Sequence, residues 1–112
     1  MDRTESMELL DSAYTVEILL DLLENPGLNK TELLSLRSAG NRTRYNRIGD
    51  LIRLGLIIVK PARHNMMHLY LSVEAQEIAL KLRQARDLLE KIPYVPADKP
   101  KNGTDDEASR PQ

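Results

Sequence analysis

The feature that most constrains this chain is a change in hydrophobic period at Gly55. Before it, apolar residues recur at the three- and four-residue spacing of amphipathic helices. Directly after it, Leu56–Lys60 is rich in β-branched residues, which is typical of a strand. A second run of strand-forming residues, His68–Leu71, follows a loop that contains Pro61. The sequence therefore predicts a β-hairpin placed immediately after a helix.

The first helix of the predicted core begins after Ser12, whose side chain is suited to cap it. It ends at Asn25-Pro26-Gly27, because proline cannot continue the hydrogen-bond ladder. Before Ser12, residues 1–11 form an N-terminal extension with two possible conformations. This segment either makes a turn of helix of its own or lengthens the helix that follows.

Two more helices are predicted between this stop and the hairpin. The second starts at Asn29, whose side chain forms a capping box with Glu32, three residues on. The third runs from Arg42 to Leu54 after a turn at residues 38–41, where Asn41 is the expected cap. The second helix is expected to bury three leucines: Leu33, Leu34 and Leu36.

A last helix is predicted over residues 73–92, with Ser72 as its cap. Its apolar residues alternate at spacings of three and four, the pattern of a coiled-coil seam: Ala75, Ile78, Leu82, Ala85, Leu89 and Ile92. Pro93 ends it, and residues 93–112 are charged and proline-containing, so we expect a disordered tail. The sequence thus predicts one α+β domain, mostly α, over residues 12–92.

Charge is strongly segregated along the chain, although its net value is only −1. Residues 1–40 carry eight acidic and three basic side chains, a net charge of −5. Residues 41–63 carry six basic side chains and one acid, Asp50, a net charge of +5. Such segregation creates a local positive field that the total conceals. It is compatible either with a partner such as nucleic acid or with an ordinary solvated face.

Composition excludes several other classes of function. The chain has no cysteine, and no apolar run approaches the ~20 residues that span a bilayer, which favours the cytoplasm. His64 and His68 have no third ligand nearby in the sequence, so neither a metal site nor a cofactor is predicted. No serine lies beside a histidine, and no constellation of residues predicts an enzyme.

Four segments, taken in order, resemble winged helix-turn-helix regulators of the ArsR/MarR-like group and small archaeal and bacterial winged-helix proteins. They are Asn29–Leu33, Thr43–Ile48, Leu51–Ile57 and Leu71–Glu74. The resemblance implies a three-helix core and a two-stranded β-hairpin wing. The long apolar seam of the last helix has two interpretations: this helix packs on the first helix, or it is a C-terminal dimerisation helix. The metal-binding cysteines of some ArsR-type repressors have no counterpart here.

This resemblance implies that the third helix enters the major groove of double-stranded DNA. Thr43 and Asn46 become the candidates for base contacts, and an asparagine amide is suited to adenine. On the helix, further candidates for base or phosphate contacts are Arg42, Tyr45, Arg47 and Arg53. On the wing, the candidates for phosphate contacts are Lys60, Arg63 and His64. Tyr45 also lies near the buried side, where it would border the core instead.

One residue departs from the pattern of these regulators. Arg44 occupies a position where they place an apolar residue facing the core. Either its side chain extends past the second helix toward a phosphate, or the third helix is rotated from the assignment above.

Two functions follow from these observations. The first is a homodimeric transcriptional regulator that binds operator DNA, with Ile78, Leu82, Ala85, Leu89 and Ile92 in the dimer interface. The alternative is a winged helix that binds another protein without touching DNA, which the acidic first helix and the apolar pair Met66-Met67 would suit.

Overall fold

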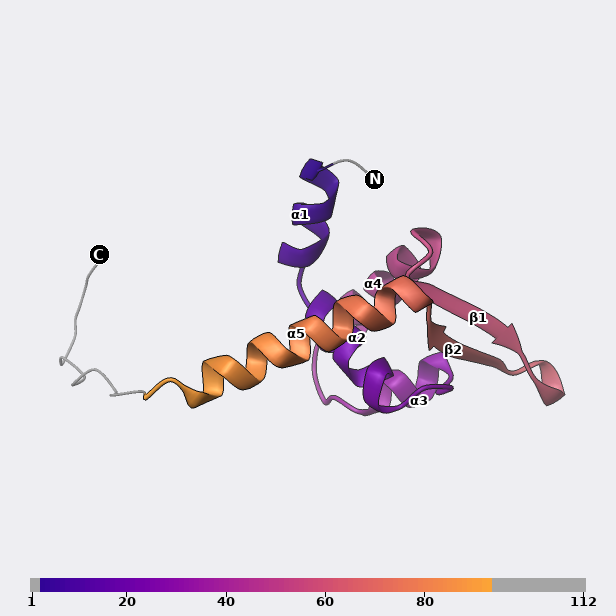
Figure 1. Cartoon of the computed structure of the whole chain (residues 1–112). Helices are drawn as coiled ribbons and strands as arrows, with labels where there is room; N and C mark the ends of the chain where they lie inside the picture. The colour runs from indigo at the N-terminus through magenta and orange to yellow at the C-terminus, as the bar shows by residue number, and fades with distance from the viewer. Residues whose placement is uncertain (1–2, 94–112) are drawn as a thin grey trace.

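The computed structural model describes residues 3–93 and contains five α-helices and one β-hairpin (Figure 1). In order, the elements are α1 (Arg3–Asp11), α2 (Thr15–Glu24), α3 (Lys30–Ser35), α4 (Asn41–Arg53), β1 (Ile57–Pro61), the short 3-10 helix η1 (Arg63–Asn65), β2 (Met67–Leu71) and α5 (Val73–Lys91). The predicted change of period at Gly55 is confirmed, since helix gives way to strand there. No helix between residues 3 and 93 has the length and apolar character to cross a bilayer. The predicted tail lies almost entirely in residues 94–112, outside this range.

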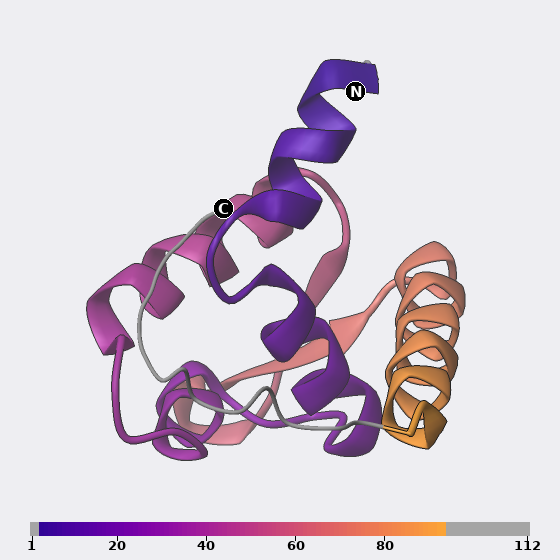
Figure 2. The ribbon, with the colours of Figure 1, turned by 90° about the vertical axis from the view of Figure 1, so that its left-hand side faces the viewer.

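The N-terminal segment forms a separate helix, α1, which projects from the rest of the fold (Figures 1 and 2). It neither stops after one turn nor continues into α2. The predicted cap at Ser12 is wrong, because its hydroxyl donates to the carbonyl of Glu8 at the end of α1. The helix α2 instead starts after Tyr14, which adopts a left-handed conformation and provides no side-chain cap.

The predicted capping box of α3 is confirmed in both directions. The amide of Glu32 donates to Asn29 Oδ1 at 2.8 Å, and the amide of Asn29 donates to Glu32 Oε1 at 2.9 Å. Of the three leucines expected inside, Leu33 is buried and Leu34 is half-buried, but Leu36 is exposed because the helix ends before it.

The turn into α4 differs from the prediction by one residue. Gly40 occupies the N-cap position with φ of 76°, a left-handed conformation that glycine adopts readily. Asn41 is therefore the first residue of the helix, and its side chain accepts a hydrogen bond from Arg44 instead of capping.

The hairpin is antiparallel, with Val59 opposite Leu69 and Lys60 opposite His68. The loop before α3 is bound to its outer edge, since Gly27 donates to the carbonyl of Leu69 and the amide of Leu69 donates to the carbonyl of Leu28. These two hydrogen bonds fix the start of α3 relative to β2. Ser72 caps α5 by accepting from the amide of Ala75, as predicted.

The core lies between α2, α3, α4, the hairpin and the first half of α5. Its buried side chains come from all of these elements: Ile18, Leu19, Leu22, Leu33, Ile48, Leu51, Ile57, Leu69, Leu71, Ala75 and Ala79. The second half of α5 extends beyond this core, on the opposite end of the molecule from the hairpin (Figure 1).

Arg44 lies inside this body and is completely inaccessible to solvent. Both explanations offered for it are wrong. Its guanidinium does not extend toward the surface but is bound to groups of α2 and α3. The helix is not rotated either, because Ile48 and Leu51 are buried on the same side, as the pattern predicts.

Candidate nucleic-acid interface

The side of α4 opposite its buried residues is open to solvent. Arg42, Thr43 and Asn46 are all exposed there, and nothing lies within 4 Å of the position that a Cβ on Gly49 would occupy. Within the part of the chain that the structure describes, Arg42 forms no ion pair. This face therefore presents a cation, a hydroxyl and an amide that are free to meet an external partner.

Tyr45 is half exposed and borders this face on the side of α3. The ammonium group of Lys30, at the start of α3, lies 4.8 Å from the centre of its ring, an attractive cation–π arrangement. Lys30 is not among the residues that the sequence predicts for this face. Its place at the start of α3 follows from the capping box, but its proximity to Tyr45 depends on how α3 and α4 pack.

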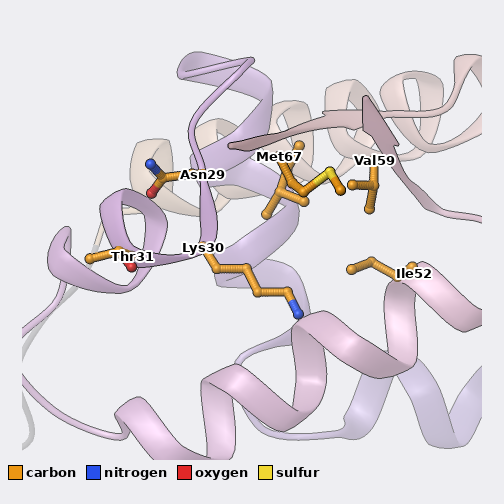
Figure 3. A pocket seen from close by; sticks show the side chains of 7 residues that line it. Asn29, Lys30, Thr31, Ile52, Val59 and Met67 are labelled. Atoms are coloured by element: carbon orange, nitrogen blue, oxygen red, sulfur yellow. The ribbon is translucent and has the colours of Figure 1, made fainter. Parts of the chain in front are cut away.

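A hollow of about 470 Å³ separates the start of α3, the second half of α4 and the hairpin (Figure 3). Lys30 reaches across it toward α4, and its other walls are largely apolar: Ile52 from α4, Val59 from β1, and Met67 and Leu69 from β2. The hollow thus joins the exposed edge of α4 to one face of the hairpin.

Arg47 and Arg53 lie on the other flank of α4, and both are bound to Asp50. Arg47 donates to Asp50 Oδ2 at 2.7 Å and to the carbonyl of Ala13 at 3.2 Å, which leaves its side chain mostly covered. Arg53 donates to Asp50 Oδ1 at 3.1 Å and remains exposed. One carboxylate therefore holds both cations in this conformation.

This flank also faces α1. A shallow cleft between the two helices is lined by Glu5 and Glu8 of α1 together with Arg47, Asp50 and Arg53 of α4. Acidic side chains therefore border the basic residues of α4 on the side of α1.

The wing residues do not all turn toward α4. Side chains alternate between the two faces of a strand, so Lys60 points away from the face that carries Val59. Its ammonium group lies 4.9 Å from the ring centre of Tyr70 on that opposite face. Arg63 and His64 are exposed at the tip, where His64 has a left-handed backbone.

The predicted seam of α5 is divided between two roles. Ala75 at the start of the seam is buried in the core, and Leu82 is partly buried against it. Ile78, Ala85, Leu89 and Ile92 are exposed, and Leu89 leaves 68% of its surface accessible. Ile78 is 38% exposed and also lines a hollow with Leu9 and Leu10 of α1, whereas Ala85, Leu89 and Ile92 are not covered by any element of residues 3–93.

No family model matches the sequence, and no curated protein matches it either. Solved structures do share its fold. A MarR protein from Peptoclostridium difficile is 21% identical, with a TM-score of 0.67 over 80% of this chain and 60% of its own length. A possible HxlR family transcriptional factor from Thermoplasma volcanium is 22% identical, with a TM-score of 0.63 over 81% of this chain and 87% of its own.

Streptococcus pneumoniae FabT, solved in complex with DNA, is also similar, at 18% identity. Its TM-score is 0.58 over 80% of this chain and 68% of FabT. The helices and the two-stranded hairpin of this chain therefore follow the order and arrangement found in these transcription regulators. The chain has the winged helix-turn-helix fold that the sequence predicts.

Proposed function

We propose that this protein is a transcriptional regulator that binds double-stranded DNA in a sequence-specific manner. The observation that carries the proposal is the open face of α4, where Arg42, Thr43 and Asn46 are exposed on a helix of 13 residues. A helix of this kind fits the major groove, and its polar side chains then meet the edges of the bases. FabT, which shares the fold, has been solved with DNA.

We assign base contacts to Thr43 and Asn46, with Asn46 pairing with adenine through its amide. Arg42 contacts guanine or phosphate, and Lys30 joins it as a phosphate contact beside Tyr45. Arg63 and His64 at the tip reach the backbone of the adjacent groove. Lys60 lies on the hairpin face turned away from α4. We therefore assign to it a contribution to the positive electrostatic field around the wing.

Arg47 and Arg53 take part only when Asp50 releases them. Both already have a carboxylate partner, so a phosphate must compete with an existing ion pair. Their contribution is therefore smaller than that of Arg42, which has no such pair within the described residues.

We further propose that the protein acts as a homodimer through α5, in the cytoplasm. The support is the apolar surface of Ile78, Ala85, Leu89 and Ile92, which would be costly to leave in water on a monomer. A two-fold dimer through this helix covers that surface. It also sets two copies of α4 about 34–36 Å apart, one turn of DNA.

The alternative function, docking to another protein, has its own support. Glu5 and Glu8 border the basic flank of α4, and Met66 and Met67 are exposed near the wing tip. A protein partner with a mixed charged and apolar surface fits these features. Binding to such a partner would not require the outer face of α4. Substitutions on that face therefore distinguish the two functions.

The test is a titration of the full chain against random-sequence and genomic duplexes at two salt concentrations. We expect affinity to fall steeply with salt, and Arg42→Ala to reduce the slope of log K against log salt by about 0.9, the value for one phosphate. Asn46→Ala should weaken only the preferred sequence. Salt-independent binding, or no binding to any duplex, would favour the protein-docking alternative.

A further inference from the structure

The buried guanidinium of Arg44 connects three helices. Its Nη1 donates to the carbonyl of Leu34 at 3.0 Å, and its Nη2 donates to the carbonyl of Leu33 at 3.1 Å. Both carbonyls belong to the end of α3, where the helix dipole is negative. Each also accepts a backbone hydrogen bond, from the amides of Leu36 and Arg37 at 3.3 Å. Nη1 also donates to Asn41 Oδ1 at 3.3 Å, within the first turn of α4 itself.

The charge of Arg44 is balanced by α2. Its Nε lies 3.2 Å from Glu17 Oε1 as an ion pair, although the two atoms do not meet hydrogen-bond geometry. The directional bonds of the guanidinium therefore go to α3, while the compensating charge comes from α2. A planar fork can bind two adjacent carbonyls at once, which a lysine ammonium on a flexible stem cannot do with the same geometry.

The network continues to the surface at Arg37. This side chain donates to Asp21 at 2.6 Å and 3.2 Å, and lies 3.8 Å from Glu17. The Asp21 carboxylate raises the pKa of the Arg37 guanidinium through its hydrogen bond and its charge. Two acids of α2 thus neutralise two arginines, but only Arg44 belongs to α4.

A buried ion pair of this kind is weak evidence for stability. Replacing such pairs with apolar residues of similar size is often neutral or stabilising, because burial of the charges is costly. The arrangement instead fixes the position of α4 relative to the end of α3. Arg44 directly follows Thr43 and comes two residues before Asn46, so fixing it to the end of α3 fixes the backbone that presents both side chains.

We infer that Arg44 is a positioning residue for sequence recognition: its bonds to Leu33 and Leu34 set the orientation in which α4 presents Thr43 and Asn46 to the bases. The inference rests on the DNA-binding function proposed above. Arg44 itself touches no DNA, so its loss should reduce discrimination between sequences without removing a phosphate contact.

The experiment compares two variants with the wild type. Arg44→Lys keeps the charge and loses the fork. The double variant Glu17→Leu/Arg44→Met removes the buried pair together, which leaves no unpaired charge and should preserve the fold. The control is the double variant Asp21→Leu/Arg37→Met, which removes the neighbouring ion pair together with the buried carboxylate of Asp21 and leaves the bonds of Arg44 intact.

The probes are a duplex that the wild-type protein enriches from a random-sequence pool, and a scrambled duplex of the same composition. Both affinities are measured over a series of salt concentrations, and thermal unfolding reports the folded fraction. We expect the affinity ratio of the two duplexes to fall about tenfold or more in both test variants, the order of discrimination of one base contact. The slope of log K against log salt should stay unchanged in the test variants. In the control, the affinity ratio of the two duplexes should also stay unchanged.

Several results would overturn the inference. A ratio preserved within about two-fold in the double variant excludes a positioning role, since tenfold corresponds to one base contact. A salt slope reduced by about 0.9 would make Arg44 a phosphate contact instead. If the wild type enriches no sequence, the proposed function fails, and this inference fails with it. If the wild type enriches a sequence but the affinity ratio is unchanged in the variants, only the inference is refuted.

Discussion

Gly40→Ala tests the turn that starts α4. Gly40 has φ of +76°, and a Cβ built there would collide with Tyr14 Oη and lie 2.6 Å from Tyr14 Cζ. The left-handed backbone costs an alanine about 1–2 kcal/mol. Crowding against the tyrosine adds about 1–3 kcal/mol, the usual range for an overpacked site. We therefore expect the free energy of unfolding to fall by about 2–5 kcal/mol in total.

The two causes can be separated by repeating the substitution in a Tyr14→Ala background. Removing the ring abolishes the crowding, so the cost of Gly40→Ala should drop there to the backbone part of about 1–2 kcal/mol. The assay is urea denaturation followed by circular dichroism. An equal cost of Gly40→Ala in the two backgrounds would refute the contact with Tyr14.

Gly49→Ala is the matched control in the same helix. Gly49 lies inside α4 without a positive φ, and its Cβ would meet nothing within 4 Å. The same substitution should therefore stabilise the protein, by about 0.5–1 kcal/mol. A loss of stability at Gly49 would show that the outer face of α4 is covered by something, contrary to its open position in the fold.

Three other substitutions test separate parts of the structure. Asp50→Asn should release Arg47 and Arg53, so duplex binding tightens at low salt and the salt slope steepens by up to about 1.8; an unchanged slope would mean that neither arginine reaches a phosphate. Leu89→Lys places a charge on the exposed surface of α5, so sedimentation analysis should find a monomer where the wild type is a dimer. A monomeric wild type would contradict the proposed interface. Asn29→Ala removes the side-chain acceptor of the capping box and should cost about 1 kcal/mol in urea denaturation, whereas a cost near zero would mean that water replaces the cap.

The order of the elements was predictable because local signals agree with the tertiary structure. The capping box of α3 involves residues three apart, and the change of period at Gly55 spans only a few residues. Such signals need no knowledge of distant contacts. For the same reason the outer face of α4 followed from helical spacing alone, and Arg42, Thr43 and Asn46 are exposed there.

Features that depend on packing were not predictable. The break between α1 and α2 occurs at Tyr14, a residue type with no preference for the left-handed conformation that it adopts. Arg44 faces the core as its spacing requires, but its partners are carbonyls at the end of another helix. Arg47 likewise meets the carbonyl of Ala13, 34 residues away in the sequence.

The wing was predictable in part. Strand alternation alone places Lys60 and Val59 on opposite faces of β1. Which of these faces lies next to α4 depends on how the hairpin packs, and Val59 takes that place.

The most direct test of the account is to map the DNA-binding surface by NMR. Amide resonances of the ¹⁵N-labelled full chain would be followed while a duplex enriched by the protein is added. We expect the largest changes at residues 42–46 and at Arg63 and His64, with little change along α1 and the second half of α5. Changes concentrated on α1 or α5, with residues 42–46 unaffected, would contradict the claim that the open face of α4 reads DNA.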